Sequence, residues 1–258
     1  REVSVPSLFV TKKVFDEYTK NYDINDGKVA LKVAHILRVS ELSRKIAISL
    51  NLSQEDIQLA ELIGLLHDIG RFEQIKRYNT FIDNKSVNHA ELGVELLFKD
   101  GLIEKFNIDK KYYKTIEIAI LNHNRGKIES GLTDMQLLHC KIIRDSDKLD
   151  IFNVSLIEDT IHTYESDNMQ NETFSDEIVR EFFEDHLINY KNRQTAGDRW
   201  ISHIAFIFDY NFKNSYKIMK EKDYINRLFD KMNFKNENTI KTASEIVKYS
   251  NEYIDRHC

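Results

Sequence analysis

A histidine and an aspartate stand side by side in the segment Leu65-Leu66-His67-Asp68-Ile69-Gly70. Its apolar residues predict that the pair lies beside a core, where an unpaired carboxylate would cost several kcal/mol. A metal ion would compensate this charge, because imidazole and carboxylate together suit zinc, manganese and iron. The chain offers four further candidate ligands, which are His35, His89, His123 and Asp147. These residues predict a metal centre.

The order of these residues and their neighbours resembles the HD superfamily of metal-dependent phosphohydrolases. Three segments carry the resemblance: His35-Ile36-Leu37-Arg38-Val39, His67-Asp68-Ile69-Gly70-Arg71 and Ser146-Asp147-Lys148-Leu149. It covers about residues 31–150 and implies an all-helical core with the ligands on neighbouring helices. Asp145 competes with Asp147, but the flanking Lys-Leu favours the latter. His89 and His123 look like the two extra histidines of the subgroup that holds two metal ions.

Within that resemblance, a dinuclear hydrolytic site needs a bridging carboxylate, neutral imidazoles and open positions for water and substrate. Asp68 is the candidate bridge, because the adjacent His67 can serve one ion while Asp68 contacts both. His35 and Asp147 complete the first ion's ligands, and the remaining two histidines complete the second ion's. Four imidazoles favour iron or manganese, although magnesium, zinc, nickel or cobalt also fit.

Three basic residues next to the candidate ligands are interpreted as catalytic groups, together with Asp68. Arg71 follows His67 by four positions, Arg125 follows the last histidine of the set by two, and Lys148 comes directly after Asp147. A planar guanidinium suits phosphoryl oxygens through paired hydrogen bonds. The alternative is a structural role, in which Arg71 pairs with a neighbouring carboxylate and Lys148 is a solvated helix residue.

The composition narrows the class of protein. The chain has 258 residues, 41% of them hydrophobic, so it can bury a sizeable core. A formal net charge of −5 argues against a general nucleic-acid binder. Its two cysteines, Cys140 and Cys258, make no disulfide framework and fit a reducing compartment. Without an apolar run of ~20 residues or a visible leader, we expect a cytoplasmic protein that does not bind membranes. The sequence does not predict the oligomeric state.

The elements that position these residues are expected to be helices almost throughout, because one proline and eight glycines leave few breaks. Ser53 is expected to cap a helix that ends at Gly70, Ser86 to cap the helix carrying His89, and Thr133 to cap a third. The other expected helices, by residue number, are 10–21, 28–50, 111–122, 134–152, 176–192, 199–212, 216–233 and 237–255. We expect one all-α domain over residues 1–258. Its metal-binding core spans about 31–150, and a helical extension over about 151–258 packs on it.

The reaction favoured by the resemblance is hydrolysis of a phosphomonoester or phosphodiester of a small metabolite or nucleotide by a metal-activated hydroxide. Some HD-fold proteins are similar in their ligands yet bind two irons in mixed valence and act as oxygenases, and the ligand set does not separate the two. A non-catalytic nucleotide-sensing module is a third reading, which the intact ligand set disfavours. The chain lacks the Gly-Tyr-Pro signature of the cyclic-dinucleotide phosphodiesterase branch. The other five histidines are expected to be structural: His139, His162, His186, His203 and His257.

Overall fold

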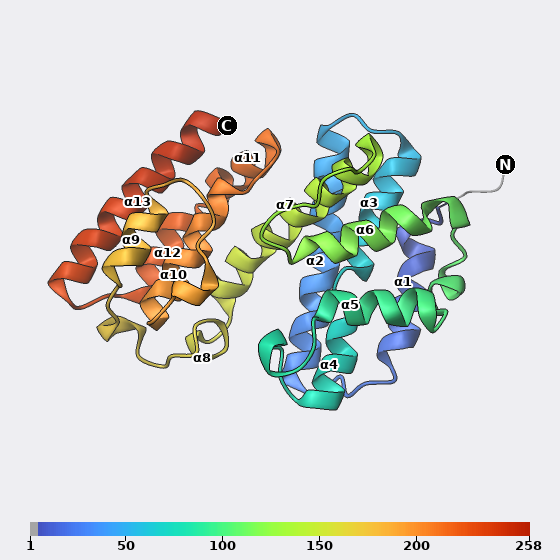
Figure 1. The fold of residues 1–258 in the computed structure, drawn as a ribbon, viewed down its shortest axis with the longest axis horizontal. Coiled ribbons are helices and arrows are strands. Elements are labelled where there is room, and N and C mark those ends of the chain that lie inside the picture. The colour runs from blue at the N-terminus through green and yellow to red at the C-terminus, as the bar shows by residue number, and fades with distance from the viewer. Residues whose placement is uncertain (1–4) are drawn as a thin grey trace. The chain divides into compact units, whose positions relative to one another are not determined.

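The computed structural model describes residues 5–258, and in this range the chain forms helices without a β-strand (Figure 1). The α-helices are α1 Leu8–Thr19, α2 Gly27–Ser49, α3 Gln54–Leu66, α4 Gly70–Tyr78, α5 His89–Val94, α6 Tyr113–His123, α7 Asp134–Ile157, α8 Thr160–Thr163, α9 Asp176–Phe182, α10 Ala196–Ile204, α11 Lys213–Glu221, α12 Tyr224–Met232 and α13 Glu237–His257. Short 3-10 helices cover Asp83–Lys85, Leu102–Phe106, Lys110–Tyr112, Met169–Asn171, Tyr190–Asn192 and Ala205–Phe208, and a π-helix covers Glu95–Lys99. The all-α fold class is confirmed.

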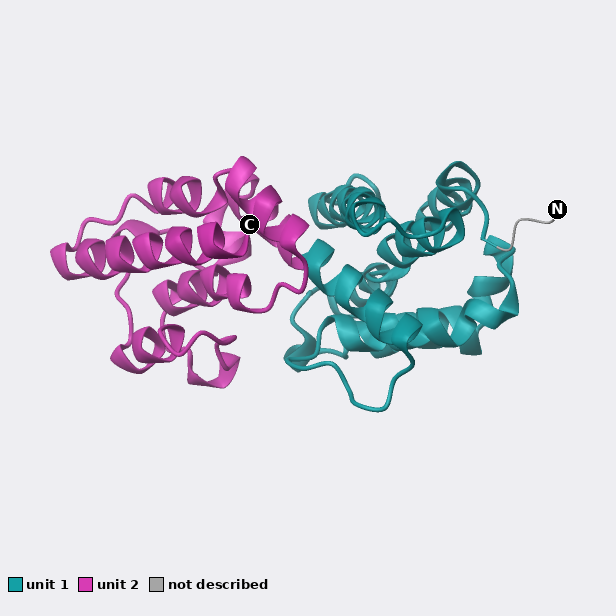
Figure 2. Ribbon diagram, turned by 90° about the horizontal axis from the view of Figure 1, so that it is seen from above, with its two compact units in different colours: residues 1–147 teal, residues 148–258 magenta. Residues whose placement is uncertain are grey.

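The chain divides into two compact units, residues 1–147 and residues 148–258 (Figure 2). The boundary falls inside α7. The candidate ligands all belong to unit 1, and the additional C-terminal helices make up unit 2. That the whole chain is a single domain, with the extension packed on the core, stays a prediction. No helix in residues 5–258 has the length and apolar character needed to span a membrane.

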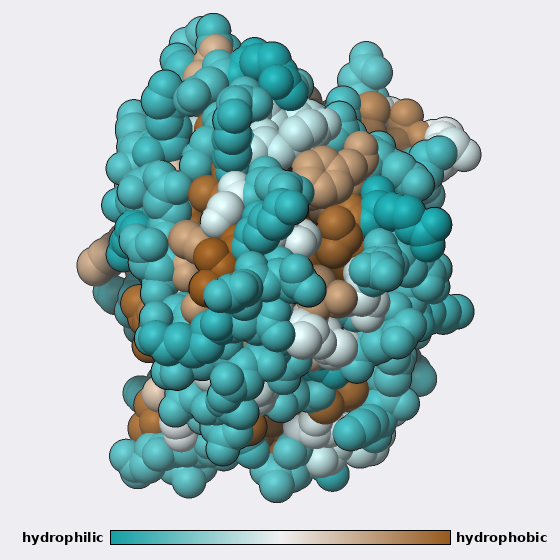
Figure 3. All heavy atoms as spheres, turned by 90° about the vertical axis from the view of Figure 1, so that its left-hand side faces the viewer, coloured by the Kyte–Doolittle hydropathy of each residue, from teal (hydrophilic) through white to brown (hydrophobic). Residues whose placement is uncertain are grey.

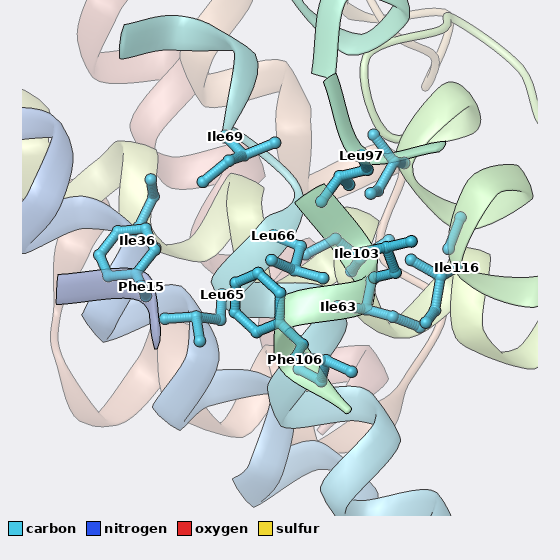
Figure 4. Close-up of a cluster of buried hydrophobic side chains, with 14 of the residues drawn as sticks. Phe15, Ile36, Ile63, Leu65, Leu66, Ile69, Leu97, Ile103, Phe106 and Ile116 are labelled. Atoms are coloured by element: carbon cyan, nitrogen blue, oxygen red, sulfur yellow. The ribbon is translucent and has the colours of Figure 1, made fainter. Parts of the chain in front are cut away.

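The core of unit 1 is built around α3. From Ile57 to Leu66 almost every residue of this helix is buried, so its apolar surface is covered on all sides. Phe15 of α1, Ile36 of α2 and Ile116 of α6 point toward α3 in the same cluster (Figure 4). Because α3 runs directly into the His-Asp pair, the best-packed helix of the unit positions the two most distinctive residues.

Two glycines let the elements of unit 1 approach each other closely. A Cβ atom on Gly64 would lie 2.7 Å from the Cα of Ser40, so α3 can pack this closely on α2 only with a glycine there. A Cβ atom on Gly70 would lie 2.3 Å from the carbonyl oxygen of His89. These two contacts bring the helices that carry histidines up to the end of α3.

Several expected boundaries were wrong in detail. The helix capped by Ser53 ends at Leu66, and Gly70 begins α4 instead of acting as a stop. Glycine is needed at that position for the close approach to α5, which outweighs its tendency to end helices. Asn88, not Ser86, caps α5, since its Oδ1 accepts from the backbone N–H groups of Ala90 and Glu91. Ser53 and Thr133 do act as caps, accepting from Asp56 and Gln136.

The helices of unit 2 are shorter and more often interrupted than the sequence pattern predicts. The helix expected over 176–192 ends at Phe182, and the one expected over 216–233 divides into α11 and α12 at Asp223, which has a φ of 49°. Aromatic rings fill its interior: Trp200 of α10 stacks on Phe174 with ring centroids 5.8 Å apart. On the face drawn in Figure 3, hydrophilic residues predominate and apolar residues show through in separate places.

Candidate metal centre

His35 and Asp147 come from the two long helices α2 and α7. The N-terminus of α2 is capped by Asp26, whose side chain accepts from the backbone N–H of Lys28. Eight residues along this helix, His35 is buried, and its Nε2 lies 3.0 Å from Oδ1 of Asp147. The side chain of Asp147 is 15% exposed, the most open of the six candidate ligands. His35 and Asp147 are the first and the last of the six candidate ligands in the sequence, and they are in direct contact.

His67 and Asp68 lie in the turn between α3 and α4, and both are buried. Nδ1 of His67 lies 2.6 Å from the carbonyl oxygen of Gly64. Because a carbonyl only accepts hydrogen bonds, Nδ1 carries the proton and Nε2 presents a lone pair. This Nε2 lies 3.3 Å from Oδ1 of Asp147, so it faces the same point as the imidazole of His35. The tautomer is the one that a metal ligand requires.

His89 is the first residue of the short helix α5 and is oriented by Asp83. Its Nδ1 lies 2.7 Å from Oδ2 of Asp83, and its backbone N–H donates to the same oxygen over 3.2 Å. Burial alone would raise the pKa of Asp83, but the hydrogen bond and charge of His89 and the charge of Arg71 outweigh it and lower the pKa to about 2. The carboxylate is therefore ionised and accepts the proton on Nδ1, which leaves Nε2 of His89 as the free donor atom.

His123 is the last residue of α6, and a buried arginine of the same unit forms hydrogen bonds to the backbone on either side of it. Its Nδ1 lies 2.6 Å from the carbonyl oxygen of Ile120, which again leaves Nε2 as a lone-pair donor. Arg144 of α7 is buried and donates to the carbonyl oxygens of Asn122 and Arg125. A guanidinium at the carboxyl end of a helix interacts favourably with its dipole and fixes its last turn.

Asp68 lies between two groups of imidazoles, one group for each of its oxygens. Oδ2 is 3.5 Å from Nε2 of both His35 and His67, and it is 3.1 Å from Nζ of Lys32. Oδ1 is 3.3 Å from Nε2 of both His89 and His123. One carboxylate thus faces two separate sets of nitrogen donors, which is the arrangement expected of a bridge.

The surroundings of the site favour ionised carboxylates. Burial opposes ionisation of Asp68, but the contacts of the surrounding histidines and the charge of Lys32 outweigh it and hold the pKa of Asp68 well below the usual value. The pKa of Asp147 is also far below its usual value, because the hydrogen bonds and charges of the adjacent histidines outweigh the effect of burial. Burial lowers the pKa of His123. Carboxylates bind a cation in their ionised form, and imidazoles bind it in their neutral form.

The donor set fits two metal ions. One group of atoms close enough to share an ion comes from His35, His67, Asp68 and Asp147, and a second comes from Asp68, His89 and His123. Nε2 of His89 and Nε2 of His123 lie 3.1 Å apart. Since both Nδ1 atoms carry the proton, two lone pairs would face each other at this distance. A cation between them removes that repulsion, so these residues fit the second of the two metal ions that the sequence predicts.

The comparison with known families bears on the same part of the chain. Residues 33–151 match the family model described as HD domain. Residues 33–151 thus have the sequence features of an HD domain. Neither the curated proteins nor the solved structures gave a match to this chain. The matched region contains all six candidate ligands and supports the family assignment made from the three segments, whereas membership of the two-metal subgroup stays a prediction.

Unit 1 contains two of the three basic residues that were interpreted as phosphate contacts. Arg71 is mostly buried and donates from Nη1 to the carbonyl oxygen of Phe81 over 2.7 Å and to Asp83 over 3.0 Å. Its partner is thus Asp83, the carboxylate that orients His89. Arg125 follows the end of α6; its side chain is 42% exposed, and its Nη1 lies 2.6 Å from Oε2 of Glu129.

Lys148, the third basic residue, is the first residue of unit 2. Its Nζ lies 3.2 Å from Oδ2 of Asp209 and 5.6 Å from the ring centroid of Phe206. These contacts give Arg71, Arg125 and Lys148 carboxylate partners, and a role of any of them in phosphate binding stays a prediction.

Three residues around the cluster were not predicted from the sequence: Lys32, Asp83 and Arg144. Lys32 precedes His35 by three positions, and residues with this spacing share a helix face. Asp83 lies in a 3-10 helix that the apolar pattern of the sequence does not predict. Arg144 stands three residues before Asp147, and only its burial distinguishes it from an ordinary solvated arginine.

Proposed function

We propose that the HD domain is a metal-dependent phosphohydrolase that holds two divalent transition metal ions, with Asp68 as their shared ligand. HD domains are generally hydrolases and bind divalent metals. The observation that carries the proposal is the division of the two Asp68 oxygens between two pairs of imidazoles. Four imidazoles make iron or manganese better suited than magnesium.

The residues have distinct roles in this proposal. His35, His67 and Asp147 hold one ion, and His89 and His123 hold the other. When bound, the metals supply a water of lowered pKa, and thus a hydroxide nucleophile near neutral pH, together with positive charge for the phosphoryl oxygens. The carbonyl and carboxylate partners of the Nδ1 atoms fix the rings before any ligand arrives, so little rotamer freedom is lost on binding.

Arg71 and Lys32 carry positive charge near the cluster, but they differ in whether they are available to bind a phosphorylated substrate. Arg71 is held by Phe81 and Asp83, which favours a role in orienting His89 over a direct contact with phosphate. Lys32 touches Asp68 directly through Nζ and remains 12% exposed. A flexible ammonium group at this place can attract and hold an anionic substrate. The substrate in this proposal is a small phosphorylated metabolite or a nucleotide.

The first test is metal content combined with phosphate release. The purified chain, reconstituted separately with iron, manganese, cobalt, nickel, zinc and magnesium, is assayed by elemental analysis and against a panel of phosphomonoesters and phosphodiesters. We expect close to two metal ions per chain and release of inorganic phosphate from at least one compound. His186→Ala, a change of an exposed histidine in unit 2, is the matched control. Less than about a tenth of an equivalent of any transition metal after reconstitution would contradict the proposal.

An oxygenase would use the same ligands, so the assay is repeated without oxygen. Hydrolysis needs water alone, and we therefore expect equal phosphate release with and without oxygen. Activity that appears only in the presence of oxygen, with a coloured di-iron protein, would replace the hydrolase by the oxygenase. A chain that binds metal and nucleotide but turns over no substrate would favour the sensing module.

A further inference from the structure

Unit 2 contains a polar pocket that the metal centre does not use. Its volume is about 380 Å³, which is in the range of small-molecule sites. Residues from two segments, 164–172 and 193–199, line it and include two arginines and two glutamates. None of them belongs to the HD domain, and sequence analysis assigned them no role.

Arg193 is the group of this lining that most needs a partner. It is half-buried, and its Nε donates to the carbonyl oxygen of Tyr190 over 3.3 Å. Within residues 5–258 no carboxylate forms an ion pair with it. Burial and the nearby charge of Arg199 lower its pKa more than the charges of Glu165 and Asp198 raise it, which means that the cation is held at a cost. A bound anion would remove that cost.

Arg199 is by contrast already neutralised. Its Nη1 lies 2.6 Å from Oε2 of Glu165, and both side chains are partly exposed. Glu172, also in the lining, forms no ion pair with another described residue. The pocket therefore offers one unpaired guanidinium together with a separate carboxylate that can accept hydrogen bonds from a ligand.

The segment that carries Arg193 is fixed in place by Asp198. This carboxylate is buried at the start of α10 and accepts from the backbone N–H groups of Ser175, Gln194 and Thr195, over 2.8 to 3.2 Å, and from the hydroxyl of Ser175. Gly197 packs so closely that a Cβ atom would lie 2.3 Å from the carbonyl oxygen of Thr173. The pocket wall is thus ordered without a ligand, which lowers the entropic cost of binding one.

We propose that this pocket is a second ligand site, which binds the oxyanion group of a small molecule, phosphate or carboxylate, through Arg193. A planar guanidinium matches such a group through two parallel hydrogen bonds. Glu172 favours a ligand that also carries a hydrogen-bond donor, such as an amino group. The site does not depend on the proposed hydrolase activity.

Calorimetric titration of the full chain tests the proposal, with inorganic phosphate, acetate and phosphoethanolamine as probes. The measurements use the Asp68→Asn chain in the presence of a chelator, so that the metal centre does not bind the probes. We expect at least one probe to bind, and Arg193→Gln to weaken its binding roughly 10-fold or more. Arg180→Gln, a change of an exposed arginine of α9 outside the pocket, is the matched control and should leave the Kd unchanged.

A variant with the opposite effect separates a ligand contact from damage to the fold. Glu165→Gln removes the partner of Arg199 and makes the pocket more positive, so phosphate should bind more tightly than to the unaltered pocket. Fluorescence of Trp200, the only tryptophan of the chain, checks that unit 2 remains folded in each variant. Equal Kd values for Arg193→Gln and its control, or no binding of any probe at millimolar concentration, would overturn the proposal.

Discussion

Both units bury histidine, but in opposite electrostatic surroundings. In unit 1 the Nε2 atoms of the buried candidate ligands converge on two carboxylates, Asp68 and Asp147. In unit 2, His203 is partly buried beside Tyr164 and Ser155, and its charged neighbours are Arg193 and Arg199. Burial removes the charge from His203 and the two arginines reinforce this effect, so its pKa falls to about 3.

This difference shows what makes a buried histidine a candidate ligand. A neutral imidazole surrounded by cations has no use for a further positive charge, whereas imidazoles that share a carboxylate offer a cation both lone pairs and compensating charge. Burial by itself does not distinguish the two cases. The following predictions test the contrast.

The largest effect is expected for Asp68→Ala. Removing the carboxylate that faces both groups of histidines should abolish metal binding and reduce phosphate release by far more than tenfold. The helical content should persist, because a buried charge disappears along with the metals. Elemental analysis, phosphate assay and circular dichroism measure the three quantities. Asp100→Ala, a change of an exposed carboxylate, is the control, and metal retained at wild-type level by Asp68→Ala would place the centre elsewhere.

His123→Ala should remove one metal and keep the other. The residue contributes to the group of Asp68, His89 and His123 alone, so the group containing His35 and Asp147 keeps all its donors. Metal content should fall from about two ions per chain toward one. If the wild-type chain itself holds a single ion, with His89 and His123 turned away from it, the dinuclear centre is wrong, and only the four-ligand group remains.

The sequence indicated the candidate ligands because each is marked by residue type and by its neighbours. The partners of those ligands carry no such mark. Asp83 reaches His89 only because a 3-10 turn brings it back to α5, and Arg144 acts on backbone carbonyl groups, which any residue could supply. The pocket of unit 2 could not be predicted at all, since Arg193 and Glu172 come together through loops rather than through a periodic pattern.

Helix boundaries show the same limit. The local preference of glycine predicts a helix stop at Gly70. The glycine is instead required by its close contact with the backbone of α5, 19 or more residues later in the sequence. The apolar pattern predicted α2 and α13 to within a few residues, because long helices with one buried face carry the strongest signal. Tertiary contacts override local preference where elements meet.

Asp83→Asn should weaken the centre moderately. The amide cannot supply the charge that fixes the Nδ1 proton of His89, so affinity for the second metal should fall roughly 10- to 100-fold while the first remains bound. Glu73→Gln is the matched control, because Glu73 is a half-buried carboxylate that pairs with Tyr22 and Arg77 and contacts no candidate ligand. Competition with a metal-sensitive dye measures the two affinities, and equal losses at both metals would contradict the role assigned to Asp83.

His203→Gln should have the smallest effect, which concerns stability and not activity. The pKa of His203 is lowered in the folded state, so below a pH of about 6.5 the unfolded chain binds a proton that the folded chain does not. Protons therefore favour unfolding. The contribution of His203 to the free energy of unfolding decreases as the pH falls from 6.5 to about 3, and below that pH it is constant.

Glutamine in place of His203 keeps a hydrogen-bonding side chain but does not titrate. Between pH 8 and pH 5 the metal-free wild type should lose up to about 2 kcal/mol relative to the variant, as followed by urea unfolding with Trp200 fluorescence. His162→Gln, a change of an exposed histidine, should track the wild type. A constant difference between wild type and His203→Gln over this range would show that His203 is not held neutral, and the contrast between the two units would disappear.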